Sequence, residues 1–114
     1  MTRKFVRLPE FDKNWASMGL DDNDLRRLQE ELLFNPEKGD VMQGTGGLRK
    51  LRFAFEGKGK SGSVRVCYVD FAVYESIYLI TAYPKSEKDN LSKSERNSIA
   101  KMTKALERAL SERK

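Results

Sequence analysis

Apolar residues in the first third of the chain repeat at the spacing of α-helices. One series is Phe11, Trp15 and Met18, and a second is Leu25, Leu28, Leu32 and Leu33, and each falls on one face of a helix. Gly19 is suited to end the first helix, and Asp21 or Asp22 can cap the second. Asn35-Pro36 is expected to stop the second helix. With a short strand at residues 4–8, this third predicts a strand followed by a helical hairpin.

Beyond residue 48 the apolar pattern changes to the period of β-strands. Apolar and polar residues alternate over 48–55, which is typical of a strand with one buried face. Residues 64–71 and 76–83 are apolar on both faces, as expected of strands in the interior of a sheet. Residues 57–63 are predicted to form a polar hairpin loop, and such short connections favour antiparallel neighbours.

The last segment predicts a closing helix. Ser92 and Glu95 have the spacing of a capping box, and apolar residues from Ile99 to Leu110 form one stripe. The predicted order is therefore β-α-α-β-β-β-α. This order favours an α+β fold, with one small domain over residues 1–114 whose mainly antiparallel sheet packs against a helical hairpin and a C-terminal helix.

Composition narrows the chemistry that the chain can perform. The 114 residues include no histidine and one cysteine, which excludes Ser-His and Cys-His nucleophiles, an internal disulfide and multi-cysteine zinc sites. No apolar run is long enough to span a bilayer, and we see no signal peptide, so a cytoplasmic protein without a membrane partner is expected. The net charge of +5 is concentrated in residues 41–66, where six basic residues face one acidic residue. This excess indicates either a polyanionic partner or a device for solubility.

Three cations of the middle segment are candidates for phosphate binding. Lys50 and Arg52 lie on one face of the predicted strand, about 7 Å apart. An ordinary solvated face is the alternative interpretation. Arg65 interrupts an otherwise apolar strand, and a guanidinium there requires either a carboxylate partner or a functional cleft.

The glycine spacing at residues 57–62 resembles that of phosphate-binding loops, but the sequence around it does not meet the requirements of such a loop. The pattern G-x-G-x-x-G would have to open a helix in a dinucleotide site, whereas a strand follows here. A kinase would require motifs that this short chain lacks. A hairpin loop is the simpler interpretation, and its Lys58 and Lys60 remain candidate contacts to a phosphate backbone.

Together, these segments resemble the RelE/ParE superfamily of bacterial toxins, and in particular its HigB-like, RelE-type branch of messenger-RNA interferases. Tyr83 and Lys85 belong to the resemblance, since they project where the last predicted strand ends at Pro84. The match runs in order through residues 8–11, 35–36, 44–52, 59–62, 65–68 and 83–92.

The resemblance implies a toxin of a type II toxin–antitoxin system that cuts messenger RNA on the ribosome. In that chemistry a ribose 2′-hydroxyl attacks the adjacent phosphate, so neither a metal nor a cofactor is expected. The implied catalytic residues are Lys50 as base, Arg52 and Arg65 at the phosphate, and Tyr83 or Lys85 as acid. The implied RNA contacts are Arg49, Lys58, Lys60 and Lys88. The implied partners are ribosomal RNA and a helix-turn-helix antitoxin, with DNA reached only through that antitoxin.

One position departs from the family pattern, and two other functions stay open. The family often has a tyrosine where this chain has Leu91, which leaves the general acid open between Tyr83 and Lys85. The gyrase-poisoning branch shares the fold without being a nuclease, but it usually lacks such a basic set. A non-catalytic RNA-binding domain is the third candidate, although the sheet offers no pair of stacking aromatics.

Overall fold

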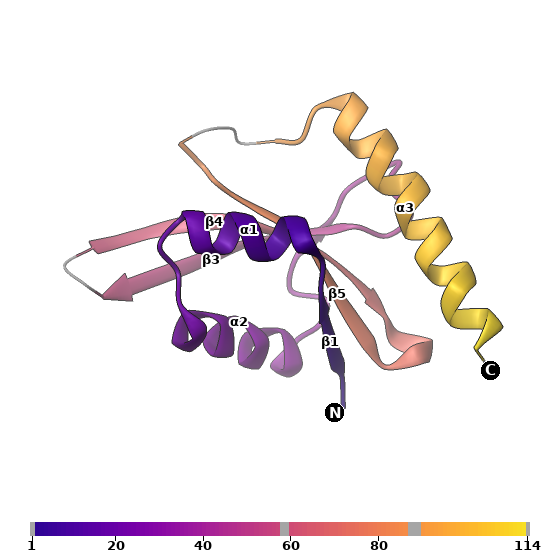
Figure 1. Cartoon of the computed structure of the whole chain (residues 1–114), viewed down its shortest axis with the longest axis horizontal. Helices are drawn as coiled ribbons and strands as arrows, with labels where there is room; N and C mark the ends of the chain where they lie inside the picture. The colour runs from indigo at the N-terminus through magenta and orange to yellow at the C-terminus, as the bar shows by residue number, and fades with distance from the viewer. Residues whose placement is uncertain (1, 58–59, 87–89, 114) are drawn as a thin grey trace.

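The computed structural model describes residues 2–57, 60–86 and 90–113, with backbone alone at 56–57 and 60–61. Over these residues it is an α+β domain with three α-helices, as predicted, and a five-stranded sheet with one strand more than predicted (Figure 1). The elements are β1 (Lys4–Arg7), α1 (Pro9–Ser17), α2 (Asp22–Phe34), β2 (Asp40–Val41), β3 (Arg49–Gly57), β4 (Lys60–Phe71), a 3-10 turn (Ala72–Tyr74), β5 (Ser76–Pro84) and α3 (Lys93–Glu112).

The helix boundaries follow the local signals in the sequence. Gly19 has a φ of 77°, a left-handed conformation that glycine adopts without strain at the end of α1. The Asp21 side chain accepts a hydrogen bond from the backbone N–H of Asp24, and the Asp24 side chain accepts one from that of Asp21. Ser92 and Glu95 make the same reciprocal pair at the start of α3, so both predicted caps are confirmed.

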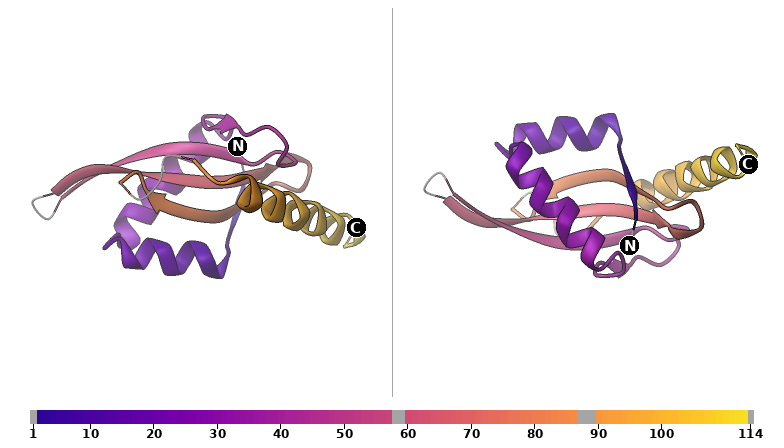
Figure 2. Two further views of the ribbon diagram at one scale, coloured as in Figure 1. Left: turned by 90° about the horizontal axis from the view of Figure 1, so that it is seen from above. Right: turned by 90° about the horizontal axis from the view of Figure 1, so that it is seen from below.

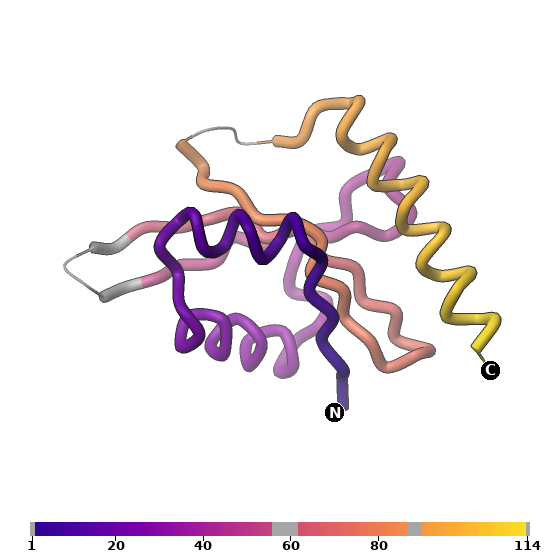
Figure 3. The backbone as a smooth tube through the Cα atoms, in the orientation of Figure 1, coloured from indigo at the N-terminus to yellow at the C-terminus, as the bar shows by residue number. Residues whose placement is uncertain are grey.

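The sheet has the strand order β1-β5-β4-β3-β2. The predicted meander of β3, β4 and β5 is antiparallel, as expected. β1 lies parallel to β5, with Lys4 opposite Ser76 and Arg7 opposite Leu79 (Figure 3). The sequence analysis did not predict β2, which pairs with only the first two residues of β3.

Two apolar layers hold the helices against opposite faces of the sheet. The first joins α1 and α2 to one face and includes Phe11, Leu28, Phe53 and Val66. The second joins α3 to the other face through residues such as Ile99. Figure 2 shows α1 and α2 together on one side of the sheet, while α3 runs outward to the C-terminus.

The predicted loop over residues 57–63 is wrong. β3 continues to Gly57 and β4 begins at Lys60, so strand pairing extends almost to the tip of the hairpin. Glycine is a turn signal in sequence, but here Gly62 lies directly opposite Phe55. A Cβ atom on Gly62 would lie 3.2 Å from Cζ of Phe55, so the aromatic ring fills the space that the glycine leaves.

Candidate functional site

Three of the predicted catalytic cations lie on one face of the sheet. Strand register pairs Arg52 of β3 directly with Arg65 of β4. Lys50 is two residues from Arg52 along β3 and therefore shares this face, which is also the face toward α3. We call Lys50, Arg52 and Arg65 the cationic face. Its two arginines occupy directly opposed positions on adjacent strands.

The three cations differ in exposure and in their contacts. Arg65 is only 9% exposed and lies between Arg52 on one side and Tyr83 of β5 on the other. Arg52 is exposed, and its Nε donates a hydrogen bond of 3.3 Å to Oγ of Ser63. The face therefore combines a buried guanidinium in the middle of the sheet with a more accessible one beside it.

Lys50 reaches the segment that precedes α3. Its Nζ donates a hydrogen bond of 2.6 Å to Oδ1 of Asn90, forty residues further along the chain. The residues after Asn90 are well anchored, because Leu91 is buried in the second apolar layer and Ser92 caps α3. Asn90 thus fixes the direction of the lysine side chain. Sequence analysis did not single Asn90 out as a site residue, although it lies within the motif at residues 83–92.

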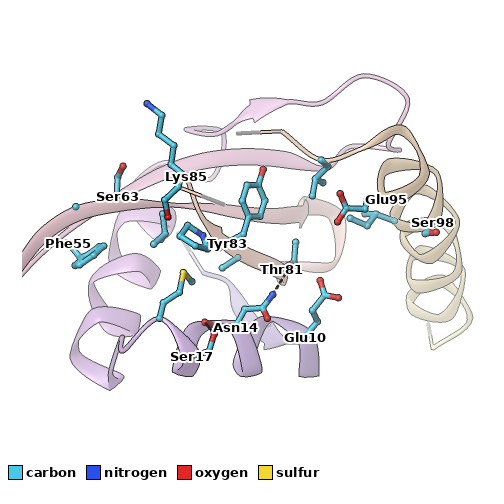
Figure 4. Close-up of a pocket in the computed structure, with 18 of the residues that line it drawn as sticks. Glu10, Asn14, Ser17, Phe55, Ser63, Thr81, Tyr83, Lys85, Glu95 and Ser98 are labelled. Atoms are coloured by element: carbon cyan, nitrogen blue, oxygen red, sulfur yellow. Dashed lines mark hydrogen bonds between the residues drawn. The ribbon is translucent and has the colours of Figure 1, made fainter. Parts of the chain in front are cut away.

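The end of β5 carries the two residues predicted as alternative proton donors. The ring of Tyr83 is 3% exposed and belongs to the second apolar layer with Leu91 and Ile99. Lys85 follows the strand and is exposed. Figure 4 shows Lys85 extending away from the sheet, whereas Tyr83 lies over it. Of the two side chains, Lys85 is the one that is open to solvent.

A groove with a volume of about 790 Å³ adjoins this end of β5 (Figure 4). In the described part of the chain no strand pairs with β5 on this side beyond Leu79, so the groove follows a free sheet edge. The Asn14 side chain of α1 contacts this edge, because it donates a hydrogen bond to Oγ1 of Thr81 in β5. The groove is lined from α1 by Glu10, Asn14 and Ser17 and from α3 by Ser94, Glu95 and Ser98. Two of its lining residues lie near the cationic face. Ser63 accepts a hydrogen bond from Arg52, and Lys85 is two residues beyond Tyr83, which lies opposite Arg65.

A turn at residues 36–39 packs against the start of β3. The hydroxyl of Tyr68 donates to the carbonyl of Pro36 and accepts from the backbone N–H of Gly39. Burial raises the pKa of the Tyr68 phenol above its usual value, because ionisation would place a charge in the core. A Cβ atom on Gly39 would lie 2.9 Å from the Tyr68 ring and 3.0 Å from the carbonyl oxygen of Lys50. The turn therefore packs directly against the backbone of the cationic face.

Within residues 2–57, 60–86 and 90–113, no three side chains among His, Cys, Asp and Glu are grouped so that they could hold a metal ion. Over the same residues, no helix combines the length and apolar character needed to cross a bilayer.

Comparison with known families identifies the group to which these features belong. The family model described as the RelE toxin of the RelE/RelB toxin–antitoxin system matches residues 4–114. The chain belongs to the RelE toxin family. Membership shows a toxin of a toxin–antitoxin system, and hence an antitoxin partner, as the sequence resemblance implied.

The fold is also similar to that of a solved RelE structure. That structure is the free state of a mutant of the E. coli toxin RelE in which two arginines are replaced by alanine. The two chains are 14% identical, with a TM-score of 0.53 over 78% of this chain and 90% of that chain. At this identity the likeness supports the RelE fold, and the site must be argued from this chain's own residues.

Of the four predicted RNA contacts of this RelE-family chain, only Arg49 has a described side chain. The guanidinium of Arg49 donates to the carbonyls of Glu37 and Gly39, so it also braces the turn at residues 36–39. Its role as an RNA contact stays a prediction. Lys58 and Lys88 lie outside the described residues, and Lys60 is described by its backbone alone.

Proposed function

We propose that this RelE-family toxin is a ribosome-dependent endoribonuclease that cuts messenger RNA and so inhibits translation in the cytoplasm. The proposal rests mainly on one observation, the pairing of Arg52 with Arg65 on the face that also carries Lys50. Arginine donates to phosphate oxygens in bidentate fashion, so two arginines at paired positions of adjacent strands suit a phosphate between them. A single strand of RNA lying across β3 and β4 would place one phosphate between them.

The proposed reaction needs no nucleophile from the protein. Lys50, in its neutral form, accepts the proton of a ribose 2′-hydroxyl, whose oxygen then attacks the adjacent phosphorus. The bond from phosphorus to the 5′-oxygen of the next nucleotide breaks, which leaves a 2′,3′-cyclic phosphate. Arg52 and Arg65 stabilise the additional negative charge on the phosphate oxygens in the transition state. Lys85 donates a proton to the departing 5′-oxygen, and Tyr83 packs beneath the site.

The two competing functions are less compatible with this face. A gyrase poison acts by binding, so it requires no opposed arginines aimed at one phosphate. A non-catalytic RNA-binding domain would usually stack bases on exposed aromatic rings, whereas Tyr83 is buried beside the cationic face. The proposed antitoxin is a helix-turn-helix protein, and DNA is bound only through that partner.

Expression of the chain without its antitoxin is expected to arrest bacterial growth by cutting messages within their coding regions. Primer extension on messages from induced cells will locate the cuts, and purified toxin on programmed ribosomes should reproduce them. Free message without ribosomes should be cut far more slowly, because the ribosome supplies the in-line geometry. Growth arrest with intact messages and trapped gyrase–DNA complexes would instead establish the gyrase poison.

Asn90→Ala is expected to slow cleavage by about fivefold, because it removes a hydrogen bond of about 1 kcal/mol that directs Lys50. The loss should appear in the single-turnover rate, with affinity for the ribosome unchanged. Asn23→Ala, at an exposed position of α2, is the matched control and should cut at the parent rate. Equal rates for the two variants would exclude Asn90 from positioning the lysine.

A further inference from the structure

β5 contains a β-bulge that changes which of its residues face the cationic side of the sheet. Along the pairing of β4 with β5, Cys67 lies opposite Thr81, whereas the next residue, Tyr68, lies opposite Leu79. Ile80 is therefore one extra residue in β5. An extra residue shifts the alternation of side chains by one position, so the residues that follow it change face.

The two apolar layers show this change of face. Before the bulge, Ile77 and Leu79 pack in the first layer, toward α1 and α2. Unbroken alternation would place Tyr83 in that layer too, because it follows both residues by an even number of positions. Instead, Tyr83 belongs to the second layer, on the face of the sheet that carries Arg65. The bulge thus brings the end of β5, and the chain that continues to Lys85, to the cationic face.

Hydrogen bonds hold the bulge from both sides at the edge of the sheet. Before it, the backbone N–H of Leu8 donates a hydrogen bond of 3.0 Å to the carbonyl of Leu79. β1 has ended at this point, and α1 continues the chain beside β5. After the bulge, Nδ2 of Asn14 in α1 donates a hydrogen bond of 3.2 Å to Oγ1 of Thr81 (Figure 4). Asn14 therefore fixes the first residue that follows the bulge.

The polar character of this contact indicates a role in direction rather than in stability. Thr81 is only 4% exposed, and its two neighbours in β5, Ile80 and Ala82, are buried apolar residues. Replacing both partners of a buried hydrogen bond by apolar groups of the same shape is often nearly neutral for stability. A hydrogen bond, however, restricts both the distance and the angle between its partners. The pair thus holds the segment from Thr81 to Lys85 in one geometry.

We propose that Asn14 is a positioning residue for the proton donor Lys85, and that it acts through Thr81. This inference rests on the proposed ribonuclease function. Thr81 precedes Lys85 by four residues, and both residues line the groove at this edge together with Asn14. When the bond from phosphorus to the 5′-oxygen breaks, Lys85 must lie within hydrogen-bond reach of that oxygen to donate its proton. Loss of the hydrogen bond releases the bulged segment, so Lys85 is within reach less often.

A message with sulfur in place of the bridging 5′-oxygen at the mapped cut tests this role. The 2′-oxygen still attacks phosphorus, but the bond that breaks joins phosphorus to sulfur, and the sulfur leaves as a thiolate. A thiol ionises at a pH of roughly 8.5, so this leaving group needs no proton from Lys85. A variant that only misplaces Lys85 should therefore cut the sulfur-containing message at the parent rate.

Asn14→Ala and Thr81→Val are each expected to slow single-turnover cleavage of the natural message on ribosomes by on the order of tenfold, a part of the hundredfold or more that a general acid contributes. The double variant should be no slower than either single variant, because both substitutions remove the same hydrogen bond. Its thermal unfolding should remain close to that of the parent. Lys85→Ala should show a larger loss that the sulfur-containing message also restores, and the control Asn23→Ala should cut both messages at the parent rate.

The outcomes separate this inference from the function on which it rests. Asn14→Ala that cuts the natural message at the parent rate, or that is slowed equally on both messages, would overturn the positioning role alone. Losses in the two single variants that multiply in the double variant would overturn it as well, because Asn14 would then not act through Thr81. A parent protein that cuts neither message on ribosomes would overturn the ribonuclease function itself.

Discussion

Arg65→Ala is expected to lower the rate of message cleavage on programmed ribosomes by about a hundredfold to a thousandfold. Arg65 is the most buried cation of the cationic face and lies directly opposite Arg52. If it contacts the scissile phosphate, its contact strengthens as negative charge grows in the transition state. Loss of one such donor commonly costs on the order of 3–4 kcal/mol. Single-turnover cleavage by the purified variant measures this loss.

The same substitution distinguishes a catalytic arginine from a structural one. Removing a phosphate-binding Arg65 should change the free energy of unfolding by only about 1 kcal/mol, because alanine is tolerated in a β-strand at about that cost. Removing half of a buried ion pair would instead cost about 3–5 kcal/mol. Arg65→Met keeps the buried stem and loses only the charged group, so it controls for the cavity that alanine leaves. Either variant, folded and cutting at the parent rate, would exclude Arg65 from the active site.

The parts of the fold that the sequence predicted are those determined by neighbours in the chain. The two helix caps depend on side chains three residues apart, Asp21 with Asp24 and Ser92 with Glu95, and both formed where the pattern indicated. The alternation around Lys50 and Arg52 likewise determined which side chains share a face. Such local rules are sufficient to predict that these cations lie together.

Features that depend on distant contacts were not predictable in this way. The parallel pairing of β1 with β5 joins residues more than seventy positions apart, and no local pattern indicates it. The loop prediction at residues 57–63 failed because Phe55 covers Gly62 across the hairpin. The contact of Lys50 with Asn90 was missed for the same reason, since it forms only after β3, β4 and β5 have assembled.

Tyr68→Phe is expected to destabilise the protein by about 2–6 kcal/mol, although it removes a single oxygen atom. Tyr68 is fully buried, and its hydroxyl satisfies both the carbonyl of Pro36 and the N–H of Gly39. Phenylalanine fills the same space but leaves these two backbone groups buried without their partner, at about 1–3 kcal/mol each. Thermal unfolding should show a fall in Tm on the order of 10 °C. Tyr78→Phe, on the neighbouring strand β5, is the control and should unfold close to the parent.

The pH dependence of stability provides a second measurement on Tyr68. Because burial raises the pKa of this phenol in the folded protein, the folded state holds the proton more tightly than the unfolded chain does. The resulting stabilisation is complete below the unfolded pKa of about 10 and is lost as pH rises through the folded pKa. The parent should therefore lose stability above pH 10 more steeply than Tyr68→Phe, which has no proton to release there. Parallel alkaline profiles for the two proteins would show that the phenol is solvated in solution. In that case the turn at residues 36–39 would not be held against the backbone of Lys50 through Tyr68, and its support for the cationic face would have to come from Arg49 and from the pairing of β2 with β3.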